Sequence, residues 1–223
     1  HGSAGLSQRR WRWLFCGAGF SGDAQPLITD DLGGGVMIGI FAAFALLVQE
    51  PDRWSEATVG PIFADGRLRG CALNFKAAQR DNLYFGGRAV GTDGSFNLYH
   101  FGEGQAGAML KVAVLDGEAM RLPDTGYLIT GFATNAEDIT SNMVGDDAGY
   151  RLTTFSLGVS TAEAIGSIAG SGAIIVGVQM SGGKSAIPFR ADLTQKQGAD
   201  WANCVDTLVA DIESALGPIE EGR

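Results

Sequence analysis

Short apolar runs that alternate with glycine-containing turns constrain the fold of this chain most. They follow one another between Cys71 and Arg190, and the 34 glycines of the chain are scattered over many turn-like places. This pattern is typical of antiparallel β-sheets. The predicted strands are Leu68–Phe75, Leu83–Val90, Ser95–Phe101, Ala108–Leu115, Tyr127–Ala133, Tyr150–Leu157, Ala173–Met180 and Ser185–Ala191. We therefore expect a mainly β domain in which antiparallel strands form a sandwich-like arrangement.

Four dipeptides predict where these strands turn back. Asp-Gly and Gly-Gly pairs supply the positive φ angles that tight hairpin turns need. Such pairs separate apolar runs at Asp65-Gly66, Asp93-Gly94, Asp116-Gly117 and Gly182-Gly183. Each of them predicts a β-hairpin.

Two segments predict helices. Ser160-Thr161-Ala162-Glu163 has the form of a capping box, and Gly170 can end the helix that follows, so we expect a short helix over Thr161–Ala169. A longer C-terminal helix is expected over Ala199–Leu216, because apolar residues recur there with helical spacing. Its apolar face comprises Trp201, Val205, Leu208, Val209, Ile212 and Leu216. We expect a single β-rich domain over residues 54–217 and a frayed tail over 218–223.

The amino-terminal part contains one strongly apolar run, Val36 to Val48. Its thirteen residues are few for a membrane span of about 20, but they match the core of a signal peptide. We interpret residues 37–49 as a signal-peptide core that begins at Met37, and residues 1–36 as upstream read-through sequence or a disordered extension. The alternative is an uncleaved membrane anchor over residues 37–48. Either interpretation places the domain outside the cytoplasm, in the periplasm or secreted.

The cysteines agree with export. Removal of the amino-terminal segment removes Cys16 and leaves Cys71 and Cys204, which can pair in an oxidising compartment. A disulfide between them would close a loop of about 130 residues, and the chain-entropy model gives such a loop roughly 4–5 kcal/mol of stabilisation. It would also attach the terminal helix to the sheet near the first strand. The alternative is two buried free thiols.

Net charge excludes one class of partner. The chain has 16 basic and 25 acidic residues, a formal net charge of −9. This charge repels the phosphate backbone of nucleic acids and anionic lipid headgroups. We expect no nucleic-acid partner, and contact with a membrane only through residues 37–48 if they are retained.

No motif identifies a reaction. Gly158-Val159-Ser160-Thr161-Ala162 approaches the nucleophile elbow of serine hydrolases, but it ends in alanine and the only histidine in the domain, His100, precedes the serine. We prefer to interpret Ser160 as a helix cap and His100 as a surface or rim residue. Ser181-Gly182-Gly183-Lys184-Ser185 ends like a phosphate-binding loop, but Val178 stands where that motif needs its first glycine. A hairpin turn is the preferred interpretation.

Metal and cofactor sites are not expected. One histidine and two paired cysteines cannot supply the usual zinc or copper ligands within one chain. Acidic pairs at Glu137-Asp138 and Asp146-Asp147 flank Asn135, Asn142 and Gly145 in what looks like the longest loop. Such a loop could hold calcium, but the spacing of an EF-hand is absent, so a solvated polar loop is preferred.

The closing part of the domain resembles a known family. Gly172–Leu193, the helix around Cys204, and Gly70-Cys71 early in the domain resemble small periplasmic proteins of the invasion-associated locus B type. The chain departs from that family in having fewer cysteines and no clear Gly-Phe before its terminal helix. The resemblance implies a non-enzymatic envelope protein. We therefore expect an exported domain that binds a protein or an envelope component. The alternatives are a hydrolase whose site no linear pattern reveals, and a membrane-anchored accessory subunit.

Overall fold

The computed structural model describes residues 53–81, 85–102, 105–131, 133–183 and 185–216. In these residues the protein is mainly β, with antiparallel sheets and two α-helices, one of them C-terminal. The predicted fold class is confirmed. The interpretations of residues 1–36, 37–49 and 218–223 lie outside the described residues.

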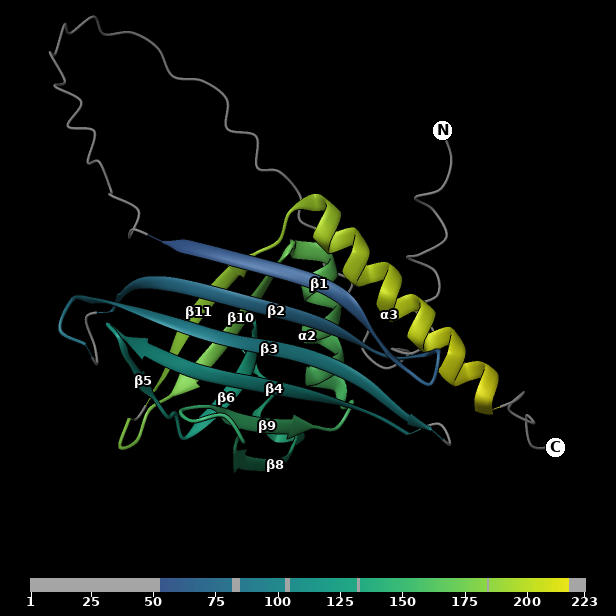
Figure 1. Cartoon of the computed structure of the whole chain (residues 1–223), viewed down its shortest axis with the longest axis horizontal. Coiled ribbons are helices and arrows are strands. Elements are labelled where there is room, and N and C mark those ends of the chain that lie inside the picture. Colours follow the sequence, from purple (N-terminus) through teal and green to yellow (C-terminus); the bar gives the residue numbers. More distant parts are fainter. Residues whose placement is uncertain (1–52, 82–84, 103–104, 132, 184, 217–223) are drawn as a thin grey trace, which may run out of the picture. The chain divides into compact units, whose positions relative to one another are not determined.

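The larger sheet has seven strands, and long neighbouring hairpins form most of it (Figure 1). Six of the strands follow one another as β1-β2-β3-β4-β9-β8, and β5 pairs with the end of β4. All of these pairs are antiparallel. The strands are β1 (Trp54–Ala64), β2 (Arg67–Asp81), β3 (Arg88–Gly102), β4 (Gln105–Asp116), β5 (Ala119–Arg121), β8 (Ile139–Val144) and β9 (Arg151–Phe155).

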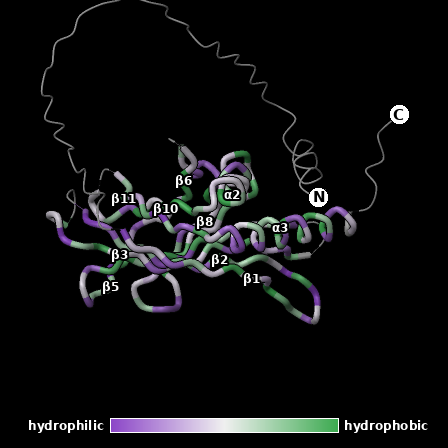
Figure 2. Tube along the Cα trace, turned by 90° about the horizontal axis from the view of Figure 1, so that it is seen from above, coloured by the Kyte–Doolittle hydropathy of each residue, from purple (hydrophilic) through white to green (hydrophobic). Residues whose placement is uncertain are grey.

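A smaller sheet and both α-helices lie on one side of the larger sheet, as Figure 2 shows. The strand order of the smaller sheet is β11-β10-β6-β7. Its strands are β6 (Thr125–Thr130), β7 (Ala133–Thr134), β10 (Ala173–Gln179) and β11 (Ala186–Asp192). The helices are α2 (Val159–Ser171) and α3 (Gln195–Leu216), with a short 3-10 helix, η1 (Ala136–Asp138), before β8. Among the described residues, no second layer covers the opposite face of the larger sheet.

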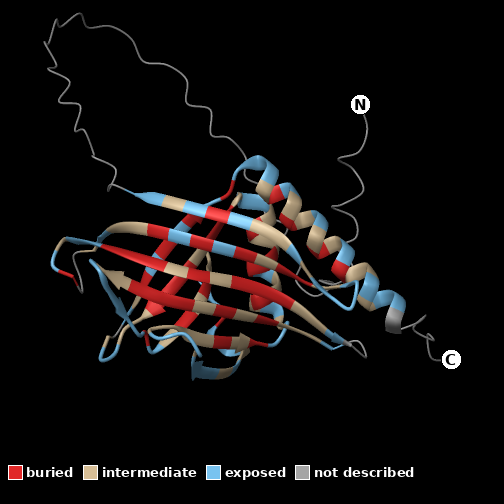
Figure 3. Cartoon of the chain, viewed as in Figure 1, coloured by how far each residue is buried: buried red, intermediate tan, exposed pale blue. Residues whose placement is uncertain are grey.

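The core lies between the larger sheet and the elements that cover it (Figure 3). Register places Leu73, Phe96 and Leu110 side by side across β2, β3 and β4, and all three are fully buried. The ring of Phe96 lies 5.9 Å from that of Trp201 in α3. The indole N–H of Trp201 donates to the carbonyl of Ile165 in α2, so this buried polar group is satisfied.

The predicted disulfide is present. Cys71 in β2 and Cys204 in α3 are bonded, with their Cα atoms 5.9 Å apart. Cys71 is fully buried on the covered face of the larger sheet. The bond therefore joins the second strand to the terminal helix across 133 residues of sequence.

Three of the four predicted hairpins form, and one prediction is wrong. Asp65-Gly66 turns β1 into β2 with φ angles of 53° and 72°, Gly117 begins the turn from β4 to β5, and Gly182 lies in the turn from β10 to β11. Asp93-Gly94 instead lies inside β3 and pairs with strands on both sides, so the two predicted strands Leu83–Val90 and Ser95–Phe101 merge around it. A Cβ at residue 94 would approach Phe75 Cζ to 2.8 Å, so this glycine makes room for a core ring.

Both predicted helices exist with different starts. Helix α2 begins at Val159, and Ser160 is not its cap: the amide of Thr161 donates to the carboxylate of Asp138 at 2.7 Å. The predicted capping box is therefore wrong, because a residue distant in sequence supplies the acceptor. Helix α3 begins at Gln195, before the predicted Ala199. A reciprocal pair of hydrogen bonds between Thr194 and Gln197 caps it, and this is the capping-box geometry.

Candidate functional site

The open face of the larger sheet is the first candidate site. We use this name for the side-chain rows of β1, β2, β3, β4, β9 and β8 that point away from the core. Strand register aligns Glu56 with Lys76 and Lys76 with Asp93 in one such row. The neighbouring row runs from Thr58 through Asn74, Ser95, Lys111 and Leu152 to Met143. Polar groups from four strands and apolar side chains from β9 and β8 thus meet on one surface.

Charged and aromatic groups interact in the middle of this face. Lys76 Nζ lies 3.7 Å from an Asp93 carboxylate oxygen. Lys111 forms an ion pair with Asp147 from the β8–β9 turn, and its Nζ lies 4.5 Å from the centre of the Tyr150 ring. An ammonium over an aromatic ring is attracted to it electrostatically. The turn after β8 is therefore held against the open face.

The surroundings of Lys111 and Tyr150 raise the pKa values of both side chains. The hydrogen bond that Lys111 donates to Asp147 raises the pKa of Lys111 above its ordinary value, against a smaller opposing effect of burial. Burial raises the pKa of Tyr150, and the negative charge of Asp93 raises it further. Near neutral pH, Lys111 is therefore charged and the phenol of Tyr150 is a hydrogen-bond donor.

A shallow hollow of about 130 Å³ opens at the β1 side of the same face. Polar residues from three strands line most of it, with Ala57 and Phe75 beneath them. The polar lining residues are Glu56, Thr58, Asn74, Lys76 and Asp93. Such a hollow fits one small polar group of a larger ligand and is far smaller than the usual pocket for a small molecule.

An aromatic pair occupies the far end of β3. The rings of Tyr99 and Phe101 stack with their centroids 6.1 Å apart, and Phe101 is 69% exposed. Burial raises the pKa of the Tyr99 phenol. A Cβ at Gly107 on β4 would lie 3.2 Å from the Phe101 ring, so this glycine lets the ring approach the strand closely. An exposed aromatic beside polar groups is common where proteins bind partners.

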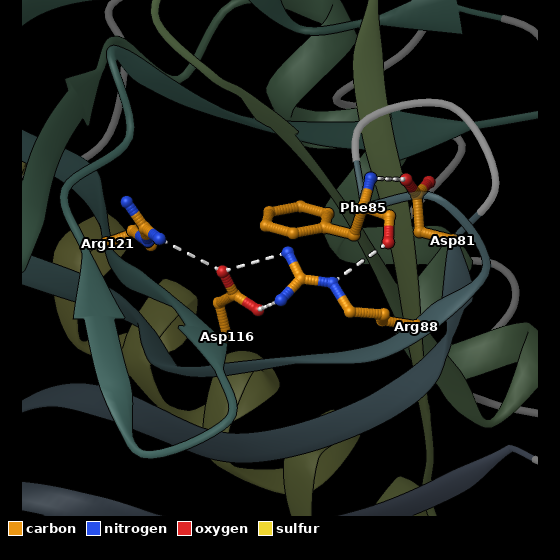
Figure 4. Close-up of polar contacts among 5 residues, drawn as sticks. All are labelled: Asp81, Phe85, Arg88, Asp116 and Arg121. Atoms are coloured by element: carbon orange, nitrogen blue, oxygen red, sulfur yellow. Dashed lines mark hydrogen bonds and ion pairs between the residues drawn. The ribbon is translucent and has the colours of Figure 1, made fainter.

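A second cluster, at the other end of the sheet, has a structural role (Figure 4). The side chain of Asp116 is only 6% exposed, and its carboxylate oxygens form ion pairs with the guanidinium groups of Arg88 and Arg121, at 3.3 Å and 3.1 Å. Arg88 also donates through Nε to the carbonyl of Phe85, whose amide donates to Asp81. These contacts fasten the β4–β5 hairpin to the segment that precedes β3.

The edge strand β8 adjoins the open face and is the second candidate. The sequence predicts a loop for these residues, and that prediction is wrong, because Ile139–Val144 pairs with β9. Met143 is 51% and Val144 58% exposed. The segment lacks the alternation of apolar and polar residues that reveals half-buried strands, so no sequence signal marks it.

The structure does not bring together Ser160 and His100, the residues of the alternative hydrolase site. The hydroxyl of Ser160 donates to the carboxylate of Glu137 in η1. His100 lies near the end of β3, and its Nε2 is buried without a hydrogen-bond partner among the described residues, so it is not simply a surface residue. No hydrogen bond between the described residues links the two.

The other candidate motifs also have structural explanations. Ser181 and Gly182 form the turn between β10 and β11, as preferred over a phosphate-binding loop, and Lys184 lies outside the described residues. Of the proposed calcium ligands, Asp138 caps α2 and Asp147 pairs with Lys111. Within the ranges that the structure describes, no three His, Cys, Asp or Glu side chains are grouped to hold a metal ion.

Comparison with protein-family models, curated proteins and solved structures finds no significant match to this chain. Among the described helices, none is long and apolar enough to cross a membrane.

Proposed function

We propose that this protein is a non-enzymatic domain outside the cytoplasm that binds another protein, or an envelope component, through the open face and its β8 edge. The observation that carries the proposal is the continuity of these two surfaces. Met143 of β8 extends the row of Thr58, Asn74, Ser95 and Lys111, so an uncovered polar face ends in an exposed strand. Uncovered faces and edges of this kind are where sheet proteins receive partners.

The disulfide supports the location. Bonds such as Cys71–Cys204 persist in oxidising compartments and are rare where thiols are kept reduced. The resemblance of Gly172–Leu193 to exported envelope proteins agrees with this location. The hydrolase alternative lacks a specific supporting observation, because within the described residues the hydroxyl of Ser160 donates a hydrogen bond to Glu137 and none to His100.

Site-specific crosslinking in the cells that make the protein tests the binding surface. A photoreactive amino acid replaces Met143 on the edge or Asn74 on the open face, and Glu213 on the exposed side of α3 serves as the control position. We expect a discrete adduct from Met143, Asn74 or both, and none from Glu213. The adduct partner is then identified by mass spectrometry and its binding is measured with purified components. Equal labelling from all three positions would contradict the proposal.

Thiol labelling of the same cells tests the location. If the domain lies outside the cytoplasm, Cys71 and Cys204 should resist alkylation until a reductant is added. Two thiols that react fully without reductant would contradict the proposed location.

A further inference from the structure

The edge strands of the two sheets differ in how they are protected against pairing with a further strand. In β1, Pro61 interrupts the edge and the carbonyl of Ala57 accepts a hydrogen bond from Gln197 of α3. In β11, Pro188 is the third of seven residues. The strand β7 has only two residues. Prolines, covering elements and shortness are the devices that prevent strand addition at an edge.

The strand β8 lacks these three devices, although a bulge interrupts its pairing with β9 between Ile139 and Ser141. It contains six residues, Ile139–Val144, with no proline and no charged side chain. In the described part of the chain, no hydrogen bond reaches its backbone from the side away from β9. A pairing strand would therefore find free backbone donors and acceptors on alternate residues, with Met143 and Val144 offering apolar contact on the two faces.

Acidic residues stand at both ends of this edge. Glu137 and Asp138 precede β8, and Asp146 and Asp147 follow it. Asp138 caps α2 and Asp147 pairs with Lys111, so these two are already compensated. Glu137 accepts only from the hydroxyl of Ser160, and Asp146 has no ion pair among the described residues. Among the described residues, one carboxylate without an ion pair therefore remains at each end, and the two are separated by the length of the strand.

This charge pattern selects the occupant. If two copies paired antiparallel about the centre of β8, between Ser141 and Asn142, the end of each strand would bring Glu137 of one copy near Asp146 of the other. Like charges brought together at both ends of a strand pair destabilise it, so the pattern opposes self-association. A strand with a basic residue at each end places opposite charges at the same positions.

We infer that β8 binds an extended peptide segment of a partner protein, whose uncharged centre pairs with Ile139–Val144 and whose Lys or Arg side chains face Glu137 and Asp146. This inference rests on the proposed binding function and names the partner class. Backbone hydrogen bonds supply the binding, and the two terminal charges supply the preference for a basic segment.

A synthetic probe tests the inference on the full oxidised chain. The probe is a fluorescent peptide with six alternating Val and Thr residues and two Lys residues at each end. By anisotropy we expect saturable binding with a Kd on the order of 10–100 µM. Hydrogen exchange should show new protection of the β8 amides. Two matched probes should not bind: one with Glu in place of Lys, and one with N-methylated alternate amides.

Three variants locate the interaction. Met143→Lys places a cation on the exposed edge without disturbing the core, and should weaken binding more than about ten-fold. Glu137→Gln with Asp146→Asn should weaken it by about five-fold at low salt and reduce its salt dependence. The control Glu213→Gln with Asp211→Asn removes the same charge from the exposed side of α3 and should leave the Kd unchanged.

Three results would overturn the inference. They are no binding at about 1 mM probe, equal binding of the N-methylated peptide, and protection of amides other than those of β8. These results are separable from a failure of the proposed function. A partner that crosslinks only from Asn74 would leave the proposed function standing and remove the role of β8. If no partner crosslinks from either position but the probe binds at β8, the proposed function fails and the inference about β8 stands.

Discussion

The two faces of the larger sheet come from the same strands and differ in almost everything else. In β2, Leu73 and Phe75 are buried under the smaller sheet and α3, whereas Asn74 and Lys76 are exposed on the open face. Burial of large apolar side chains contributes about 1.5–3 kcal/mol each, and exposed ion pairs contribute about 0–1 kcal/mol. Stability is therefore concentrated on one face, which leaves the other free to vary for binding. Substitutions on each face should separate these two roles.

Loss of the disulfide should give the largest effect, since it removes the covalent crosslink between β2 and α3. For Cys71→Ala with Cys204→Ala, we expect the free energy of unfolding to fall by about 4–5 kcal/mol, because 133 residues separate the cysteines. Urea unfolding of the oxidised protein and the double variant measures this difference. Reduction of the native protein should reproduce most of it. A loss under about 1 kcal/mol would show that packing alone holds α3 on the sheet.

Substitution of Gly94 should give the next largest effect, because at this position the covered face tolerates no side chain. A Cβ there would lie 2.4 Å from the carbonyl oxygen of Lys111 and 2.8 Å from Phe75 Cζ. We expect Gly94→Ala to destabilise the protein by about 1–3 kcal/mol through overpacking.

The matched control is Gly60→Ala in β1, where no atom lies within 4 Å of the added Cβ. Its stability should change by less than about 0.5 kcal/mol. Urea midpoints of the two variants give the comparison, and equal midpoints would show that the sheet yields easily around residue 94.

The covered face was largely predictable, because its signals are local. Alternation in β4 identifies a strand with one buried face, and the presence of only two cysteines after residue 16 predicts their pairing. Asp93-Gly94 misleads because glycine has two uses in sheets, in a turn and where a neighbour comes close. Only the position of the Phe75 ring, in another strand, distinguishes them.

The helix caps show the same limit: a residue distant in sequence can decide which local pattern acts. Ser160-x-x-Glu163 and Thr194-x-x-Gln197 both have the form of a capping box, and only the second acts as one. At α2 the carboxylate of Asp138 takes the place of the cap, and Gly158 allows it to approach: a Cβ there would lie 1.9 Å from an Asp138 oxygen. That contact depends on the path of the chain through β8 and β9, which no local pattern contains.

The open face was not predictable, since strand register creates it. Lys111 and Asp147 are 36 residues apart, and Lys76 and Asp93 meet only because β2 and β3 pair in one register. The edge strand β8 is mostly exposed and half of its residues are polar, so it resembles a loop in sequence. Surfaces that bind are for this reason harder to infer than the core that supports them.

The smallest predicted effect is a pH dependence that belongs to the open face. The hydrogen bond that Lys111 donates to Asp147 raises the pKa of Lys111 above 10.5, so the folded state favours the charged amine. This contribution is complete below pH 10.5 and is lost as the pH rises through the higher folded value. Burial raises the pKa of Tyr150 above 10.0, so its ionisation also opposes folding at high pH. The free energy of unfolding should therefore decline as the pH rises above about 10.

Lys111→Met removes the first contribution and Tyr150→Phe the second, so each variant should show a shallower decline. Urea unfolding between about pH 8 and pH 11 measures it. Because Lys111 and Asp147 are partly exposed, the difference at pH 8 should stay under about 1 kcal/mol. A decline as steep in Lys111→Met as in the native protein would mean that Asp147 does not hold this amine in solution. This ion pair would then not hold the β8–β9 turn against the open face. The proposed binding surface would lose the contact that joins β8 to the rest of it.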